Sequence, residues 1–344
     1  MVGERLDWVD VARGMAILLI VELHTQGALR QLGADHPLLV SINVALATVR
    51  LPTFFLVSGL LSVSVLAVPW REFLRRRPAT LLYLYLLWGS VLLAVATLLA
   101  AATGGSATTV ARANLHDLLV ADSVLWYLAA LAVFCTAAKL SRRIPAPLQL
   151  AAATALAMVA TIDLFPAASW GIDHMLSCYL YFLIGRHFRP VVIDFATSAT
   201  TRRCVLLAVT WLVAGGLLRL ADPSGRALIA LLPLVALPLA VSLAGIVAGR
   251  PVAAPLRSIG RHTLPIYVLH PVVIAILVGV SGGDQPLAGL PLAGLPLAGQ
   301  AGLVLAATAA VAASCWLLWR RLRRVPGLFD LPTPQAAVGH RSRT

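Results

Sequence analysis

Long apolar runs are the feature that most limits how this chain can fold. Ten stretches of about 17–25 residues are almost free of charge, a length that crosses the hydrocarbon core of a bilayer as a helix. They end at clusters of Arg, Pro and Gly. The predicted spans are residues 11–29, 45–68, 79–102, 122–139, 147–164, 173–188, 204–220, 227–248, 262–280 and 300–319. The sequence therefore predicts an all-α polytopic integral membrane protein with about ten transmembrane helices.

Composition supports a membrane protein and argues against a nucleic-acid partner. The 344 residues are 60% hydrophobic and only 12% charged, whereas soluble domains carry about 25% charged residues. The formal net charge is +13, but the arginines lie between apolar runs and not in one basic patch. The four cysteines all fall inside apolar stretches without a CxxC pair, so we expect neither a disulfide framework nor a metal site.

The distribution of basic residues predicts the orientation of the chain. Of the 27 Lys and Arg residues, 22 fall on one side of the predicted spans when the connecting segments are assigned alternately to the two sides. By the positive-inside rule, that side and both termini are cytoplasmic. We expect one transmembrane domain over residues 1–320 and a short, basic, disordered cytoplasmic tail over residues 321–344. The sequence leaves the oligomeric state open.

Two ionisable residues lie on one face of the first span. Arg13 and His24 are eleven residues apart, which on a helix is about three turns and about 16 Å along the axis. Asp10, one turn before Arg13, shares that face. A charged side chain at the centre of a membrane helix costs a few kcal/mol, so such residues are candidates for a functional site.

The second span and the segment after it carry further candidates. Arg50 could extend to the outer headgroups or line a site, and the sequence favours neither. Ser58 and Gly59 are a small pair that favours close helix packing over substrate contact. The cluster Arg75, Arg76 and Arg77 is typical of an orientation signal at the lipid phosphates, although guanidinium groups also suit the phosphates of acyl-coenzyme A.

Later spans repeat this pattern of polar faces. Asp173 and Tyr181 belong to one polar stripe on the sixth span, while Trp126 is placed where an outer aromatic belt is expected. On the ninth span, Thr263, Tyr267 and His270 share a face. A single buried histidine is usually structural, but two at similar depth, His24 and His270, favour a shared polar cavity.

At these residues the chain resembles the membrane-bound acyltransferase 3 family, bacterial O-acyltransferases that modify surface polysaccharides and other extracytoplasmic acceptors. The first-helix pattern is an arginine and a histidine separated by ten residues, here Arg13 and His24. The segments around Pro52–Gly59, Leu125–Leu128 and Ile259–His270 are similar to the family patterns PxFFxxSG, LWFL and IGR…IYLLH. The resemblance runs from Arg5 to about Pro271.

The resemblance implies transfer of an acyl group, most often acetyl, from cytoplasmic acyl-coenzyme A to a hydroxyl of an extracytoplasmic sugar in a polysaccharide or glycolipid. It also implies a multi-pass protein of the bacterial inner membrane, in contact with lipid, with acyl-coenzyme A as co-substrate and no permanently bound cofactor. The acceptor and the acyl chain stay open.

Residue roles follow from combining the resemblance with the helix geometry. His24 could accept a proton from the acceptor hydroxyl or carry the acyl group, and the sequence does not choose between these. Its orienting partner must come from another span, because Asp10 is about 21 Å away along the axis. The expected catalytic residues are His24, Arg13 and Asp10. The expected donor contacts are Arg13, Arg75, Arg76 and Arg77, and the expected site-lining or acceptor residues are Arg50, Ser58, Trp126, Asp173, Tyr181, Tyr267 and His270.

Two other classes of function compete with an enzyme. A transporter or flippase would use the intramembrane Arg and His for a substrate or proton pathway. The sequence shows no convincing internal two-fold repeat, which argues against that class. A purely structural scaffold leaves Arg13, His24 and His270 without a purpose.

Overall fold

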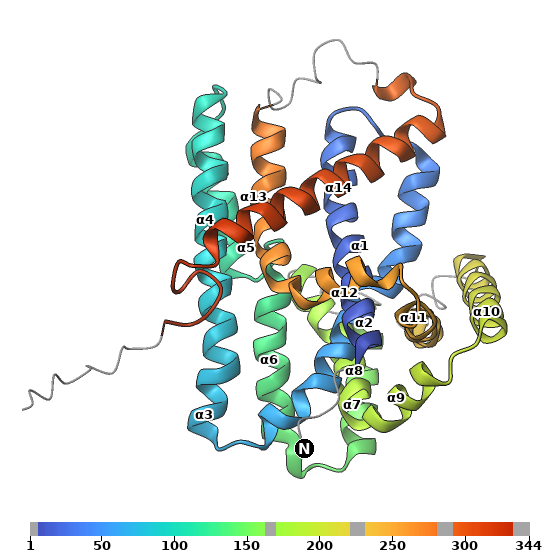
Figure 1. Ribbon diagram of the computed structural model, residues 1–344. Helices are drawn as coiled ribbons and strands as arrows, with labels where there is room; N and C mark the ends of the chain where they lie inside the picture. The colour runs from blue at the N-terminus through green and yellow to red at the C-terminus, as the bar shows by residue number, and fades with distance from the viewer. Residues whose placement is uncertain (1–5, 162–169, 221–230, 281–291, 333–344) are drawn as a thin grey trace, which may run out of the picture.

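The computed structural model describes residues 6–161, 170–220, 231–280 and 292–332, and within them the chain forms helices and no strands (Figure 1). The longer helices are α1 (Asp7–Gln31), α2 (Pro37–Ala67), α4 (Thr80–Ala102), α6 (Trp126–Leu140), α7 (Ala146–Thr161), α8 (Trp170–His187), α10 (Thr201–Leu220), α11 (Pro233–Ala248), α13 (Thr263–Val280) and α14 (Leu297–Leu322). The shorter ones are α3 (Trp70–Leu74), α5 (Ala107–Leu119), α9 (Arg189–Thr197) and α12 (Ala253–Arg261).

Each predicted span overlaps one of the ten longer helices, but not all of these have the length and composition of a span. Among the described residues, four helices are long and apolar enough to cross a membrane, or five if α11 and α12 are counted as one bent span. In Figure 1, α14 crosses obliquely in front of α13, and α11 is viewed almost along its axis. The all-α class is confirmed, while ten spans remain a prediction.

Four helices occupy segments that we expected to be connections. Helix α5 begins after Ser106, whose hydroxyl accepts a hydrogen bond from the backbone N–H of Thr109, an ordinary N-cap. It packs along α4, where the Tyr85 hydroxyl donates to the carbonyl of Leu118 (2.6 Å). Helix α12 follows α11 after a bend of 116°. These helices are short or amphipathic, so a search for long apolar runs does not detect them.

A buried lysine of α6 binds the carbonyl groups at the end of α2. Lys139, from α6, is 1% exposed, and its ammonium group donates to the carbonyls of Leu66 (2.9 Å) and Val68 (2.6 Å). The same group lies over the rings of Trp70 and Phe73. These contacts replace the water that a buried ammonium loses. Lys139 is one of the basic residues that predict the orientation, and in the structure it also stabilises the turn between α2 and α3.

Close contact between α2 and α8 depends on two glycines. A Cβ atom at Gly59 would collide with the backbone oxygen of Phe182, and one at Gly185 would collide with that of Leu56. The two helices can approach this closely only without side chains at these positions. The expectation that Gly59 packs against a neighbouring helix is confirmed.

The segment after α14 is partly ordered against α4. The Tyr83 hydroxyl donates to the carbonyl of Gly327 (3.0 Å), and Trp88 Nε1 donates to the carbonyl of Leu328 (2.7 Å). The ring of Phe329 stacks on Trp88 at 5.7 Å between centroids. We expected residues 321–344 to be disordered; residues 321–332 instead have these defined contacts, and residues 333–344 lie outside the described part.

Candidate active site

Helix α12 holds the beginning of α1, which carries the first site residues. A Cβ at Gly260 would collide with the backbone oxygen of Asp10, so the two helices touch backbone to backbone. Nearby, Arg261 Nε donates to Asp10 Oδ2 at 3.1 Å. Asp10 therefore joins α1 to α12, and the structure supports a structural function for it. Its predicted catalytic role stays a prediction.

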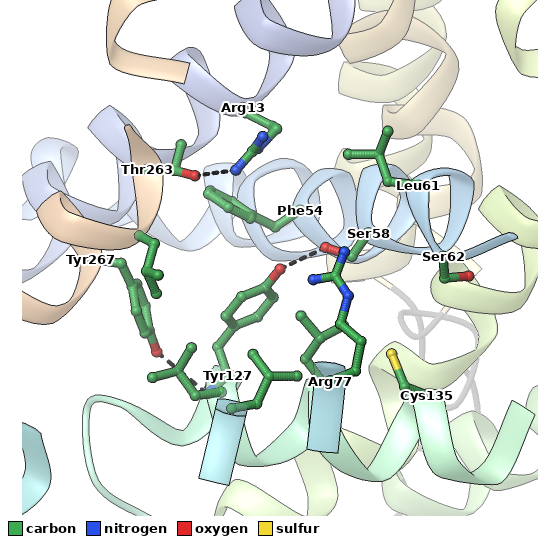
Figure 2. A pocket seen from close by; sticks show the side chains of 14 residues that line it. Arg13, Phe54, Ser58, Leu61, Ser62, Arg77, Tyr127, Cys135, Thr263 and Tyr267 are labelled. Carbon is green, nitrogen blue, oxygen red and sulfur yellow. Dashed lines mark hydrogen bonds between the residues drawn. The ribbon is translucent and has the colours of Figure 1, made fainter. Parts of the chain in front are cut away.

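A cavity of about 240 Å³ lies between α1, α2, α6 and α13. Figure 2 shows its lining: Arg13 comes from one side and Arg77 from the opposite side, with Phe54, Ser58 and Tyr127 between them. The guanidinium group of Arg13 donates to the Thr263 hydroxyl at 2.6 Å. Two arginines thus border one interior space, which suits an anionic ligand.

The arginine cluster divides between two spaces. Arg77 lines the interior cavity, whereas Arg75 and Arg76 line a second, more open cavity of about 740 Å³ together with Arg71 and Asp330. Residues 75–79 form one turn of π-helix that includes Pro78. Successive residues of a helix point in different directions, so three adjacent arginines cannot face one site. We expected all three to contact the donor, and only Arg77 shares the cavity with Arg13.

Hydrogen bonds fix the aromatic wall of the cavity. The hydroxyls of Ser58 and Tyr127 are 2.6 Å apart. The Tyr267 hydroxyl donates to the carbonyl of Val124 (2.9 Å) and accepts from the backbone N–H of Tyr127 (3.3 Å). Ser58 and Tyr267 therefore line this cavity, and contact of either residue with a substrate stays a prediction. Tyr127 also belongs to this wall. The sequence did not single it out, because an aromatic residue at the start of a span is equally typical of an outer aromatic belt.

The two histidines lie together beyond this wall. The rings of His24 and His270 are 5.2 Å apart between centroids and tilted by 38°. The ring of Tyr267, which lines the cavity, is 5.8 Å from that of His270. The side chain of His270 is completely buried. The two histidines are therefore neighbours, as the sequence favoured, and Tyr267 contacts both the cavity and His270. A cavity shared by the two histidines stays a prediction.

Arg50 is neither at the headgroups nor in this cavity. It is 5% exposed, and its Nη1 donates to the side-chain oxygen of Asn43 at 2.6 Å. The Asn43 amide in turn donates to Glu22 (2.9 Å) and to Gln26. The result is a polar network between α1 and α2. Glu22 and Gln26 lie one turn apart on α1, and the positive charge of Arg50 lies close enough to His24 to act on that histidine.

Three other expected site-lining residues are elsewhere. Trp126 is 5% exposed, packs its ring against Phe55 and Trp170 and does not line the cavity. Its place in an outer aromatic belt stays a prediction. Tyr181 is buried in the core, and Asp173 lies in the first turn of α8. Neither lines the cavity. A stripe at four-residue spacing predicts that a face is buried but not which neighbour it meets.

Comparison with known proteins decides the family. The family described as an acyltransferase domain matches residues 6–320, nearly the whole chain. The chain belongs to the acyltransferase 3 family. It is also 25% identical over 303 residues to the inner membrane protein YcfT of Escherichia coli (strain K12), covering 78% of this chain and 80% of that protein. No solved structure matches the chain. The acyltransferase 3 match includes α1, α2, α6 and α13, which build the cavity.

Proposed function

We propose that the protein transfers an acyl group from acyl-coenzyme A to a hydroxyl of an extracytoplasmic acceptor, with His24 as the catalytic residue. The observation that carries this proposal is the arrangement of Arg13 and Arg77 around one cavity whose wall residue Tyr267 contacts the His24–His270 pair. Membership of an acyltransferase family supports the reaction type. Acetyl is the proposed acyl group and a surface sugar the proposed acceptor.

The volume of the cavity limits which part of the donor enters it. Its 240 Å³ corresponds to about eight water molecules at about 30 Å³ each. That space suits the narrow thioester arm of acyl-coenzyme A better than its bulkier nucleotide. The nucleotide would then remain in the more open cavity that Arg75 and Arg76 line, where guanidinium groups can bind phosphate. Arg13 and Arg77 would hold the polar groups nearest the thioester.

The proposed orientation gives the reaction a direction. With the arginine cluster in the cytoplasm, as the positive-inside rule predicts, the donor enters near Arg77 and its thioester arm extends along α1 toward His24. The acyl group passes to an acceptor hydroxyl that reaches His24 from the outer side, either directly or by way of acyl-His24. The C–S bond of the thioester breaks, the proton of the hydroxyl passes through His24 to the sulfur, and coenzyme A leaves toward the cytoplasm. The proposal therefore includes a multi-pass location in the bacterial inner membrane.

A transporter is the rival function. One pair of helices among the described residues, α11 and α12, is bent like the broken helices of transporters. Such transporters contain two matched breaks in their two halves, and the described residues contain one. The cavity, moreover, is lined by residues of the acyltransferase match.

Inverted membrane vesicles test the proposal. Vesicles that contain the protein receive acetyl-coenzyme A labelled in the acetyl group, and both release of coenzyme A and label in the glycan and glycolipid fraction are measured. We expect both to exceed the values for vesicles without the protein. Equal values in the two preparations, for acetyl and longer acyl donors, would refute the proposed reaction.

A further inference from the structure

A buried nitrogen of His270 has no partner in the protein. Its Nε2 atom is inaccessible to solvent and makes no hydrogen bond, although the ring is completely buried. Leaving a buried polar atom unpaired costs about 1–3 kcal/mol. An apolar residue of similar size would avoid that cost, so packing alone gives no reason for a histidine here.

The other ring nitrogen determines the tautomer. His270 Nδ1 lies 3.2 Å from the carbonyl oxygen of Ile266, one turn earlier on α13. A carbonyl oxygen can only accept, so this contact is a hydrogen bond only when Nδ1 carries the hydrogen. Nε2 of the neutral ring is then an acceptor with a free lone pair.

His24 is at the right distance to donate to that lone pair. Two imidazoles joined by an N–H···N hydrogen bond of about 2.9 Å have ring centres about 5.2 Å apart, because each nitrogen lies about 1.1–1.2 Å from its ring centre. The observed separation between the centroids of His24 and His270 is 5.2 Å. Tyr267, 5.8 Å away, packs beside His270. At this separation the bond forms when one nitrogen of each ring points along the line between the two ring centres.

We propose that His270 is the positioning residue of His24. In this assignment, which rests on the proposed acyl transfer, Nε2 of His270 accepts the N–H of His24 during the reaction. The bond fixes the tautomer and the ring plane of His24, so that its second nitrogen presents a lone pair to the substrate. A carboxylate does this for the histidine of a catalytic triad; here a second, neutral imidazole does it. No carboxylate is required next to His24.

Two amide substitutions separate this role from simple packing. His270→Gln places an amide oxygen near the position of Nε2 and keeps an acceptor for His24. His270→Asn places its amide near Nδ1, keeps a donor for Ile266 and provides no acceptor at Nε2. In the vesicle assay with acetyl-coenzyme A, we expect His270→Gln to keep at least one tenth of the maximal rate per protein molecule. We expect His270→Asn to lose about a hundredfold or more in that rate, with KM for acetyl-coenzyme A changed less than threefold.

Controls distinguish the possible failures. Thermal unfolding of both purified variants shows whether they fold. Equal rates for folded Gln and Asn variants would overturn the positioning role while the wild-type rate still upholds the proposed function. If the Asn variant does not fold, the Gln variant decides: a folded His270→Gln protein below one hundredth of the wild-type rate overturns the proposal. Wild-type vesicles without transfer would instead refute the proposed function itself.

Discussion

At the scale of single residues, the site combines two arginines that approach one cavity from different helices. Arg13 is held by Thr263, and Arg77 enters from the turn between α3 and α4. A guanidinium group offers several donors in a fixed plane, whereas an ammonium group is a point charge. This difference makes the role of Arg13 testable without removing its charge.

Arg13→Lys should weaken donor binding because the planar donor set is lost. We expect KM for acetyl-coenzyme A to rise about tenfold, a difference of about 1.4 kcal/mol, with a smaller change in the maximal rate. Arg30→Lys is the matched control, since Arg30 lies at the other end of α1 in an exposed ion pair with Asp35. An unchanged KM for Arg13→Lys would exclude a donor-binding role for this residue.

Sequence reasoning located some of these residues and misplaced others. Arg13, His24 and His270 were predictable because an ionisable group in an apolar run has few structural uses. Trp126 and Asp173 were assigned to the site but do not line the cavity. The sequence marks them as aromatic or polar without showing which end or face of the span meets the site. One sequence does not say which face meets which helix. The position of Arg50 was missed for another reason. Its hydrogen-bond partner Asn43, seven residues away on the same helix, is polar but uncharged and was not recognised as a partner.

At the scale of secondary structure elements, close backbone contacts determine where the helices cross. Helices α1 and α12 meet at Gly260, and α2 meets α8 at Gly59 and Gly185. The existence of the long helices was predictable from apolar length alone. Helix α12 was not predicted, because its residues were assigned to a basic segment that connects two spans.

Gly59→Ala should destabilise the protein because the new methyl group would meet the backbone of α8. We expect a loss of about 1–3 kcal/mol, the usual cost of overpacking, measured as a lower melting temperature in detergent. Gly27→Ala is the control: it lies in α1 with nothing within 4 Å of its Cβ position, so alanine should be neutral or stabilising there. Equal melting temperatures for the two variants would contradict the assigned contact.

At the scale of the whole molecule, the proposed mechanism requires a defined orientation. The arginine-lined cavities must face the cytoplasm, where acyl-coenzyme A is made, and the loop between α1 and α2 must face outward. Charge counting predicts this arrangement. The family was recognisable from motifs in α1, α2 and α6 and from one motif that spans α12 and α13. The acceptor could not be recognised from the sequence, because no motif in it is specific for one hydroxyl-bearing substrate.

Cysteine labelling tests the orientation. Asp35→Cys lies in the loop after α1, and Arg143→Cys lies between α6 and α7; both positions are exposed. We expect a membrane-impermeant maleimide to label Asp35→Cys in intact spheroplasts and Arg143→Cys only after permeabilisation. The wild-type protein gives the background, since three of its four cysteines are buried. The reverse pattern would invert the proposed topology.

The central claim is that His24 performs the acyl transfer, and His24→Ala tests it most directly. In inverted vesicles with labelled acetyl-coenzyme A, the variant should insert and melt like the wild type yet fall to the rate of vesicles that lack the protein. That result would place the chemistry at the pair formed by α1 and α13. Wild-type incorporation of label by a well-expressed His24→Ala protein would contradict the account.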